Sequence, residues 1–281
     1  MKPYVVSADL SVLWRRTAGV SLPEDALEQF RLQGAQKLES IFGACDWIAE
    51  NELEDGLVRL LQANDLPVVS LDQVYTFCGS SLDLTRLVDQ NGEEAGYGSR
   101  NGDALSLPEK VRNLARNIVG GELVLVDDVM FSGAMYAHLI DLFRENGVRV
   151  PRVYAGVAIG EGIRRMKTID CEVFAVRTYD EVIDEVCERD FMPGAPFSGR
   201  AVAGCRNVGM PYLLPFGRPT AWASIPDANA RSFSSLFLRL SAEMYRVMRT
   251  RRRALPRDIY GLHGDEDVFI SDLLTQAAED I

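Results

Sequence analysis

Two adjacent aspartates, Asp127 and Asp128, stand between an aliphatic run (residues 123–126) and a short loop that contains Ser132 and Gly133. Burying two carboxylates has a high cost in free energy unless they are paired or used. Ionised carboxylates accept hydrogen bonds from neighbouring hydroxyls, and a glycine loop lets backbone N–H groups approach a phosphate closely. The residue types in this order therefore predict a site for a sugar phosphate, with the acids on its hydroxyls and the loop on its phosphate.

A strand and a helix must position these residues. Residues 123–126 form a continuous aliphatic run after Gly120 and Gly121, which is typical of a strand buried on both faces of a parallel sheet. An amphipathic pattern over residues 134–146 predicts a helix, whose free N–H groups and positive dipole end attract a phosphate. Ligands of open α/β sheets bind outside the carboxyl ends of the strands, which is where the two acids are expected.

Strand and helix patterns alternate along the middle of the chain. The predicted strands are residues 67–76, 82–88, 123–128, 152–158 and 172–177, and the predicted helices are residues 106–119, 134–146, 161–168 and 179–187. This alternation predicts an α/β fold with a parallel sheet flanked by helices. The glycine-rich residues 89–103 are expected either as a solvent-exposed connection or as a mobile loop over a site.

The two ends of the chain differ from this middle part. Helical patterns over residues 23–42 and 52–62 predict an N-terminal helical cap or hood, which we place at residues 1–65. Residues 66–200 are expected to form the α/β core. Residues 201–281 are expected as a C-terminal segment with Pro and aromatic residues and a long helix over residues 230–253, packed on the core.

Composition narrows the class of protein. A net charge of −11 argues against a nucleic-acid binder, because phosphate backbones favour a basic face. A local group of arginines with bound Mg²⁺ can still hold a small anionic substrate. No apolar run is long enough to span a membrane, and the start lacks the features of a signal peptide, so a cytoplasmic location is expected. The five scattered cysteines are expected to be reduced, and only two histidines are present, which argues against a Ser-His-Asp site.

Residues 123–135 resemble the signature of type I phosphoribosyltransferases, which use 5-phosphoribosyl 1-pyrophosphate (PRPP) as ribose donor. The family signature has a hydrophobic strand, two acids, a hydrophobic pair and a Thr/Ser-rich loop with a central Gly. The resemblance implies a phosphoribosyltransferase-like core with extra N- and C-terminal helical regions. It also implies transfer of the ribose 5-phosphate group from PRPP to a nitrogenous base, with Mg²⁺ as cofactor and release of pyrophosphate.

The resemblance assigns roles to individual residues. Asp127 and Asp128 would bind the ribose hydroxyls, take part in catalysis and hold Mg²⁺ indirectly through the ribose. The 5′-phosphate would lie against the loop of Phe131, Ser132, Gly133, Ala134 and Met135. Gly79 and Ser80 would belong to the pyrophosphate loop, and Arg100 in a flexible loop over residues 92–103 would meet the pyrophosphate. Residues 189–194 stand where purine-specific members contact the base, whereas Phe131 and Met135 replace the family's usual hydroxyl residues.

Other interpretations stay open. The two acids could cap a neighbouring helix or pair with Arg, Ser132 could be a simple helix N-cap, and Arg100 could be a solvated loop residue. A non-catalytic PRPP- or nucleotide-binding regulatory protein is the alternative function, and an unrelated α/β protein with an accidental signature is a third reading. The expected partners are PRPP and a base, without membrane or nucleic acid, and a homodimer is left open.

Overall fold

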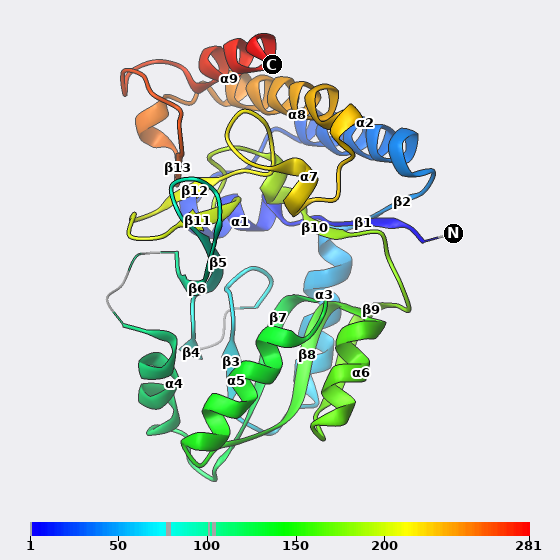
Figure 1. Cartoon of the computed structure of the whole chain (residues 1–281), viewed down its shortest axis with the longest axis vertical. Coiled ribbons are helices and arrows are strands. Elements are labelled where there is room, and N and C mark those ends of the chain that lie inside the picture. Colours follow the sequence, from blue (N-terminus) through cyan, green and yellow to red (C-terminus); the bar gives the residue numbers. More distant parts are fainter. Residues whose placement is uncertain (1, 77–79, 101, 103–104) are drawn as a thin grey trace.

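The computed structural model describes residues 2–76, 80–100, 102 and 105–281. Its elements are arranged as two bodies stacked along the longest axis (Figure 1). The lower body contains a five-stranded parallel sheet, here called the core sheet. The upper body contains a three-stranded parallel sheet, the small sheet, and a five-stranded sheet of both strand directions, the mixed sheet. The predicted α/β class, with parallel sheets flanked by helices, is confirmed.

The core sheet has the strand order β4-β3-β7-β8-β9, and all four pairings are parallel. Its strands are β3 (Val68–Ser70), β4 (Ser80–Ser81), β7 (Glu122–Met130), β8 (Arg149–Ile159) and β9 (Glu172–Tyr179). One face carries helices α4 (Leu107–Ala115), α5 (Ala134–Glu145) and α6 (Gly160–Thr168), and the other carries α3 (Glu50–Gln62). Strand β7 therefore lies inside the sheet, as the aliphatic run predicts.

Helices on both faces explain why that run does not alternate with polar residues. Leu123 and Leu125 pack with helices α4 to α6 on one face. Val124 and Val126 pack on the other face with Leu57 of α3 and its neighbours. Because successive side chains of a strand point to opposite faces, a strand covered on both sides needs apolar residues at every position.

Two predicted strand ends differ from the structure. Strand β7 continues past the two acids to Met130, because the long strand β8 supplies partners for Val129 and Met130. The strand predicted over residues 67–76 ends at Ser70 instead. The chain bends there, and Asp72 accepts a hydrogen bond from the Val74 N–H at 3.2 Å, so this segment leaves the sheet at its carboxyl edge.

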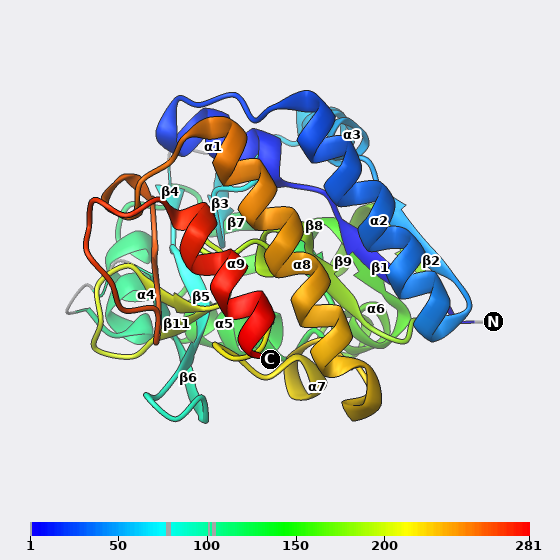
Figure 2. The ribbon, with the colours of Figure 1, turned by 90° about the horizontal axis from the view of Figure 1, so that it is seen from above.

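The small sheet has the order β10-β1-β2 and is also parallel. It is formed by β1 (Tyr4–Ser7), β2 (Cys45–Ile48) and β10 (Glu185–Cys187). Three helices lie side by side at this end of the molecule (Figure 2), namely α2 (Glu24–Phe42), α8 (Asp227–Met248) and α9 (Ile270–Asp280). Helix α2 packs on β1 and β2, α8 lies between α2 and α9, and α1 (Leu10–Ala18) follows β1. In the core beneath them, the ring of Phe237 contacts the rings of both Phe30 and Phe191.

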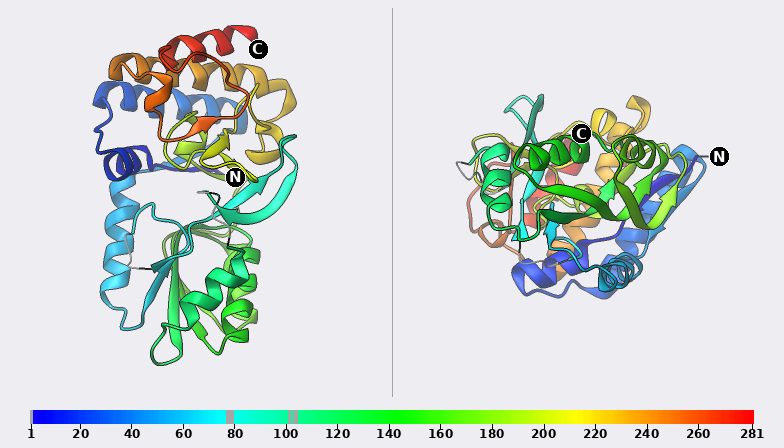
Figure 3. Two further views of the ribbon diagram at one scale, coloured as in Figure 1. Left: turned by 90° about the vertical axis from the view of Figure 1, so that its left-hand side faces the viewer. Right: turned by 90° about the horizontal axis from the view of Figure 1, so that it is seen from below.

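The mixed sheet has the order β13-β12-β11-β5-β6. Its strands are β5 (Leu84–Val88), β6 (Glu94–Ser99), β11 (Arg200–Val202), β12 (Val208–Met210) and β13 (Asp258–Ile259). Strands β5 and β6 form an antiparallel hairpin that extends beside both bodies (Figure 3, left, teal). The short helix α7 (Pro219–Trp222) and the 3-10 helix η1 (Glu188–Phe191) complete the wall above the core sheet.

Two predicted segments are wrong. Residues 89–103, expected as a loop, contain strand β6. The turn before it is held by Asp89, whose carboxylate accepts hydrogen bonds from the N–H groups of Asn91 (2.8 Å) and Glu93 (2.9 Å). The helix predicted over residues 179–187 is replaced by strand β10, because parallel pairing with β1 decides its conformation. Both strands depend on partners far away in the sequence, which local patterns do not show.

The two bodies draw on interleaved parts of the chain. Residues 1–65 contribute strands β1 and β2 to the upper body as well as helix α3 to the lower one. Strands β5, β6 and β10, within residues 66–200, belong to sheets of the upper body. The division of the chain at residues 65 and 200 stays a prediction. None of the helices in the described part of the chain has the length and apolar character needed to cross a membrane.

Candidate functional site

A polar cavity of about 310 Å³ lies at the carboxyl edge of the core sheet and is walled by both bodies. The lower body contributes Asp72, the two acids of β7 and the loop that opens α5. The upper body contributes β10 and η1 with parts of the mixed sheet and α7. The structure brings these predicted site residues into its lining: Arg100, Asp127, Asp128, Phe131, Ser132, Gly133, Ala134 and Met135.

The loop at residues 131–133 turns the chain from β7 into helix α5. Gly133 has φ of +71°, and a Cβ there would lie 3.1 Å from the Cα of Gly162, so both the backbone conformation and the close approach favour glycine. The Ser132 hydroxyl accepts a hydrogen bond from the Ala134 N–H at 3.3 Å, and the Ser132 carbonyl accepts one from Arg165 Nε at 2.7 Å. Helix α5 begins at Ala134, so its amino end, the positive end of its dipole, faces the cavity beside the two acids.

Asp127 and Asp128 are both about nine-tenths buried, with 8% of each residue exposed. A third buried acid, Asp72, lies just after β3, the strand that pairs with β7. One carboxylate oxygen from each of the three lies within 4.8 Å of the other two. The sequence pattern does not mark Asp72, because it predicts that the strand continues through this residue. An acid just after a strand next to β7 is the signal that could have found it.

The three carboxylates differ in pKa. Burial, together with the charges of Asp128 and Asp72, raises the pKa of Asp127 well above its usual range, although the Tyr136 hydroxyl donates to it at 3.1 Å. Burial and the Asp128 charge raise the pKa of Asp72 to about 7. Burial acts in the same direction on Asp128, but Arg189 outweighs it and lowers the pKa of this carboxyl. The cluster therefore carries more acid groups than its surroundings can keep ionised.

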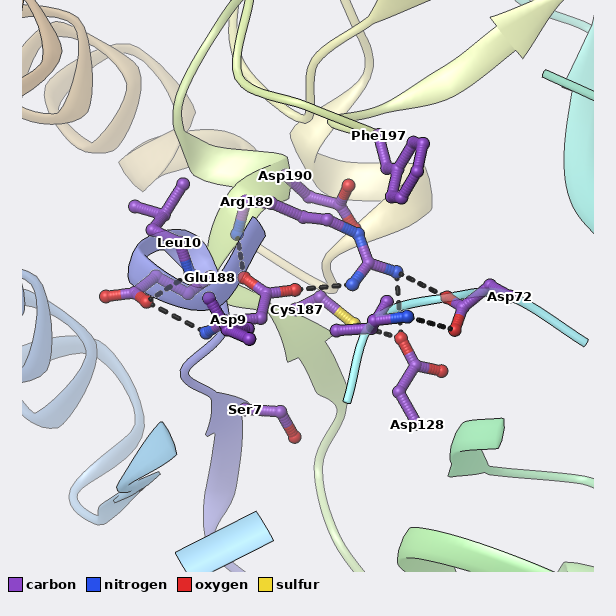
Figure 4. A network of polar contacts seen from close by, with 12 residues as sticks. Ser7, Asp9, Leu10, Asp72, Asp128, Cys187, Glu188, Arg189, Asp190 and Phe197 are labelled. Atoms are coloured by element: carbon purple, nitrogen blue, oxygen red, sulfur yellow. Dashed lines mark hydrogen bonds and ion pairs between the residues drawn. The ribbon is translucent and has the colours of Figure 1, made fainter. Parts of the chain in front are cut away.

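Arg189 joins the two bodies at this cluster (Figure 4). It lies on η1 in the upper body and donates to Asp128 at 2.8 Å, to Asp72 at 3.5 Å and to Asp9, the residue that follows β1 and Ala8. The Arg189 N–H also donates to Asp9 at 3.0 Å, and the Cys187 thiol donates to Asp128 at 3.4 Å. Sequence reasoning placed residues 189–194 near the base, but it did not predict that Arg189 would be the counter-ion of the acids.

Arg100 reaches the cavity from the end of β6 and not from a long flexible loop. Its guanidinium donates to the Phe197 carbonyl at 2.6 Å and lies 5.2 Å from the centre of the Phe197 ring. Its Nε is buried and has no hydrogen-bond partner among the described residues. A buried guanidinium with spare donor capacity beside the acid cluster can bind an anionic group of a ligand.

The expected pyrophosphate loop stays unassigned. Gly79 lies outside the described residues. Ser80 is on β4, two strands from β7, and it is not among the described residues that line the cavity. The structure therefore does not bring Ser80 together with Asp127 and Asp128.

The acid cluster fits a divalent cation. Its three ligands are carboxylate oxygens, which is the donor set that Mg²⁺ prefers. Burial, with the charges of the neighbouring acids, raises the pKa of Asp72 and of Asp127 even though Arg189 lies beside the cluster. A bound cation would supply the missing positive charge.

The carboxyl of Asp72 makes the stability of the protein depend on pH. Its pKa is about 7 in the folded state, against an ordinary value of 3.8, so the folded state holds this proton more tightly than the unfolded chain. The contribution of Asp72 to stability therefore falls as pH rises from about 4 to about 7. Relative to the Asp72→Asn variant, we expect the free energy of unfolding of the natural chain, measured in urea, to fall by about 2–3 kcal/mol between about pH 5 and about pH 8.

Two controls accompany this measurement. Mg²⁺ should remove most of the loss in the natural chain, because metal binding favours the deprotonated carboxylate, and it should act less on the Asp72→Asn variant. Replacing Asp141 by Asn, an exposed acid of α5 that pairs with Arg144, should leave the pH profile unchanged. Parallel profiles for the natural chain and the Asp72→Asn variant would contradict the assignment.

No family model matches the sequence, and neither does any curated protein. Solved structures show partial similarity of fold to phosphoribosyltransferases. Orotate phosphoribosyltransferase from Aeropyrum pernix is 28% identical over 22% of this chain, which spans only 36% of that protein, with a TM-score of 0.21. Adenine phosphoribosyltransferase from Thermoanaerobacter pseudethanolicus is 12% identical over 46% of this chain and 79% of its own, with a TM-score of 0.30.

A further similar structure is orotate phosphoribosyltransferase from Mycobacterium tuberculosis in complex with PRPP. It is 13% identical over 60% of this chain and 89% of its own, with a TM-score of 0.28. These likenesses concern part of the chain and its fold alone. The function proposed below rests on the residues of the site.

Proposed function

We propose that this chain is a Mg²⁺-dependent phosphoribosyltransferase that transfers the ribose 5-phosphate group from PRPP to a nitrogenous base and releases pyrophosphate. One observation carries the proposal. A single cavity holds an acid pair near the carboxyl end of β7, a third acid just after the neighbouring strand β3 and a glycine loop at the amino end of α5. Acids for hydroxyls beside backbone donors for a phosphate are the two halves of a site for a phosphorylated sugar.

The ribose 5-phosphate is held by the lower body. Asp127 and Asp128 accept hydrogen bonds from the two ribose hydroxyls, and the Tyr136 hydroxyl fixes the orientation of Asp127. Backbone N–H groups of the loop at residues 131–135 and the Ser132 hydroxyl receive the phosphate at the positive end of the α5 dipole. Phe131 and Met135 add apolar walls but no hydroxyl, so the backbone carries most of the phosphate binding.

In the reaction, the bond between the anomeric carbon and the pyrophosphate oxygen breaks, a bond from a base nitrogen to that carbon forms, and the proton of that nitrogen passes to the released pyrophosphate. Positive charge develops on the ribose ring during this exchange, and the acid pair stabilises it. Negative charge develops on the leaving pyrophosphate, toward which Arg100 can direct its buried guanidinium. The upper body closes the cavity above the ribose and limits the access of water.

Asp72, Asp127 and Asp128 are the residues that would hold Mg²⁺, in contact with the metal or through ribose oxygens. When bound, Mg²⁺ supplies positive charge to the pyrophosphate group and to the acid cluster. The chain's own contribution is to keep three carboxylates close together, with Arg189 fixing the position of Asp72 and Asp128.

A non-catalytic PRPP- or nucleotide-binding protein is the second candidate. The observation in its favour is that Met135 and Phe131 supply no hydroxyl to the phosphate loop, while Arg189 already pairs with two of the three acids. Such a protein would bind PRPP in the same cavity and use the two bodies to report its presence.

Pyrophosphate release separates the two candidates. We expect release that requires PRPP, Mg²⁺ and one base out of a panel of purines and pyrimidines, and we expect PRPP with Mg²⁺ to raise the melting temperature. Stabilisation by PRPP without release with any base would favour the regulatory protein. An unchanged melting temperature with PRPP and Mg²⁺ at millimolar concentrations would contradict both.

A further inference from the structure

The upper wall of the cavity combines arginines with aromatic rings. Arg86 of β5, Tyr97 of β6 and Arg200 of β11 line it together with Tyr212 and Trp222. None of these residues has a role in holding the ribose phosphate. They come from the mixed sheet and the segment around α7, across the cavity from the acids of β7.

Arg200 is the central cation of this wall. It is 4% exposed, and its guanidinium carbon lies 4.9 Å from the centre of the Trp222 ring and 5.9 Å from that of Tyr212. Its Nε is buried and has no hydrogen-bond partner among the described residues. A guanidinium packed against two neighbouring aromatic rings presents a rigid fork of N–H donors, which suits the two oxygens of a carboxylate.

Arg200 forms an ion pair with an acid on the protein surface. Arg200 Nη1 donates at 3.0 Å to Glu94, whose side chain is 80% exposed on the β6 hairpin. An ion pair with so exposed a partner contributes little, whereas a buried guanidinium needs an anion to offset its lost hydration. A carboxylate of a ligand inside the cavity would therefore replace Glu94 favourably.

Two acids of the same wall accept hydrogen bonds from groups other than Arg200, although the charges of Arg86 and Arg200 also act on Asp184. Asp184 accepts a hydrogen bond from the Ser224 hydroxyl at 2.8 Å, and Asp190 accepts one from the Gly199 N–H at 2.7 Å. The neighbouring Tyr212 hydroxyl raises the pKa of the Arg86 guanidinium. Tyr97, by contrast, is 42% exposed, so one aromatic face remains open beside the cavity.

We propose that the second substrate is a small planar ring that bears a carboxylate. Its carboxylate pairs with Arg200 in place of Glu94, and its ring lies against the aromatic side chains of Tyr97, Tyr212 and Trp222. The inference deepens the proposed function, on which it rests for the reaction that the bound ring would undergo. Binding of the ring itself depends only on the upper wall. A cavity of about 310 Å³ is at the small end for ligand sites, which favours a single ring beside a sugar phosphate.

Calorimetric titration of the full chain with matched pairs of ligands tests this proposal. Each pair consists of a pyridine or pyrimidine carboxylate and the corresponding neutral carboxamide, titrated with and without PRPP and Mg²⁺. We expect at least one carboxylate to bind about tenfold or more tightly than its carboxamide, because a charged hydrogen-bonded pair is lost in the amide. Equal affinities within every pair would overturn the proposal.

Substitutions at the hairpin give a sharper result. Glu94→Gln should strengthen binding of the carboxylate several-fold and leave the carboxamide unchanged, because it frees Arg200. Glu93→Gln is the matched control, since this neighbouring exposed acid pairs with Arg218 and not with Arg200. Arg200→Gln should remove the preference for the carboxylate. An unchanged or weaker carboxylate affinity in Glu94→Gln would count against the site.

The same titrations, together with the pyrophosphate assay, distinguish a failure of the carboxylate site from a failure of the proposed transferase reaction. Carboxylate binding with the expected response to Glu94→Gln, but no pyrophosphate release with any ring, would support the site and reject the transferase. Pyrophosphate release with neutral bases alone would support the transferase and reject the carboxylate substrate.

Discussion

Replacing Asp127 by Asn is expected to abolish binding of PRPP with Mg²⁺ and, at the same time, to stabilise the free protein. Asp127 is buried beside Asp128 and Asp72, and burial with these like charges raises its pKa well above the usual range. In the free protein the carboxyl is therefore held in its neutral form at a cost in stability. The amide of Asn has nearly the same shape, can accept the Tyr136 hydrogen bond through its oxygen and carries no charge.

PRPP with Mg²⁺ binds the ionised carboxylate of Asp127, which burial disfavours in the free protein. Loss of a charged hydrogen bond to a ribose hydroxyl, together with loss of a ligand for the cation, should lower the affinity for PRPP with Mg²⁺ about 100-fold or more. Calorimetric titration measures that affinity, and urea unfolding measures the gain in stability, expected at about 1–2 kcal/mol at neutral pH. Asp141→Asn on the exposed face of α5 is the control for loss of an acid away from the cavity.

An Asp127→Asn variant that bound PRPP as tightly as the natural chain would remove the basis of the proposed function. It would mean that residues 123–135 resemble the PRPP signature by accident. A variant that lost binding and also lost stability would instead show that the carboxylate of Asp127 has a structural role.

Replacing Arg189 by Met is expected to cause the largest loss of stability from a single substitution at the site. Arg189 is buried between Asp9, Asp72 and Asp128, and it is the shared cation of these carboxylates. Removing one member of a buried ion network leaves the other charges without compensation, which costs about 3–5 kcal/mol. Urea unfolding at neutral pH should show this loss, and it should be smaller at about pH 5, where Asp72, whose pKa is about 7, is protonated.

A matched control and a double variant test the reason for this loss. Arg177→Met removes an arginine whose ion pair with Glu52 is solvent-exposed, so its effect should be about 1 kcal/mol or less. Adding Asp128→Asn to Arg189→Met should restore part of the stability, because it removes one uncompensated charge. A loss below about 1 kcal/mol for Arg189→Met would show that the network does not hold the two bodies together.

The site residues that could be predicted from the sequence are those whose structure is local. A strand covered on both faces needs consecutive aliphatic residues, so the run at residues 123–126 marks β7 directly. A tight turn into α5 needs a residue that tolerates positive φ, and Gly133 supplies it one residue before the helix. The two acids lie within that strand, shortly before the turn, and the same short segment therefore indicates both the strand and the ligand class.

The residues that could not be predicted depend on distant pairing. Arg189 and Asp72 are 117 residues apart in the sequence, and Arg189 and Asp9 are 180 apart. Residues 179–187 have a helical pattern, but pairing with β1 makes β10 a strand and thereby directs η1 toward the acids. The resemblance implies a role for Arg100, but the glycine-rich pattern before this residue predicts a loop and not strand β6. Pairing of β6 with β5 places Arg100 in the cavity.

The sequence by itself determined the α/β class, the strand β7, the glycine turn and the acid pair, because each of these follows from interactions within about a dozen residues. Only the tertiary structure decided that Asp72 joins the pair, that Arg189 is their counter-ion and that Arg200 packs against two aromatic rings. The physical reason is that these side chains meet where the carboxyl edge of one sheet faces a second body. The local propensities of the residues do not determine which distant strands pair at that position.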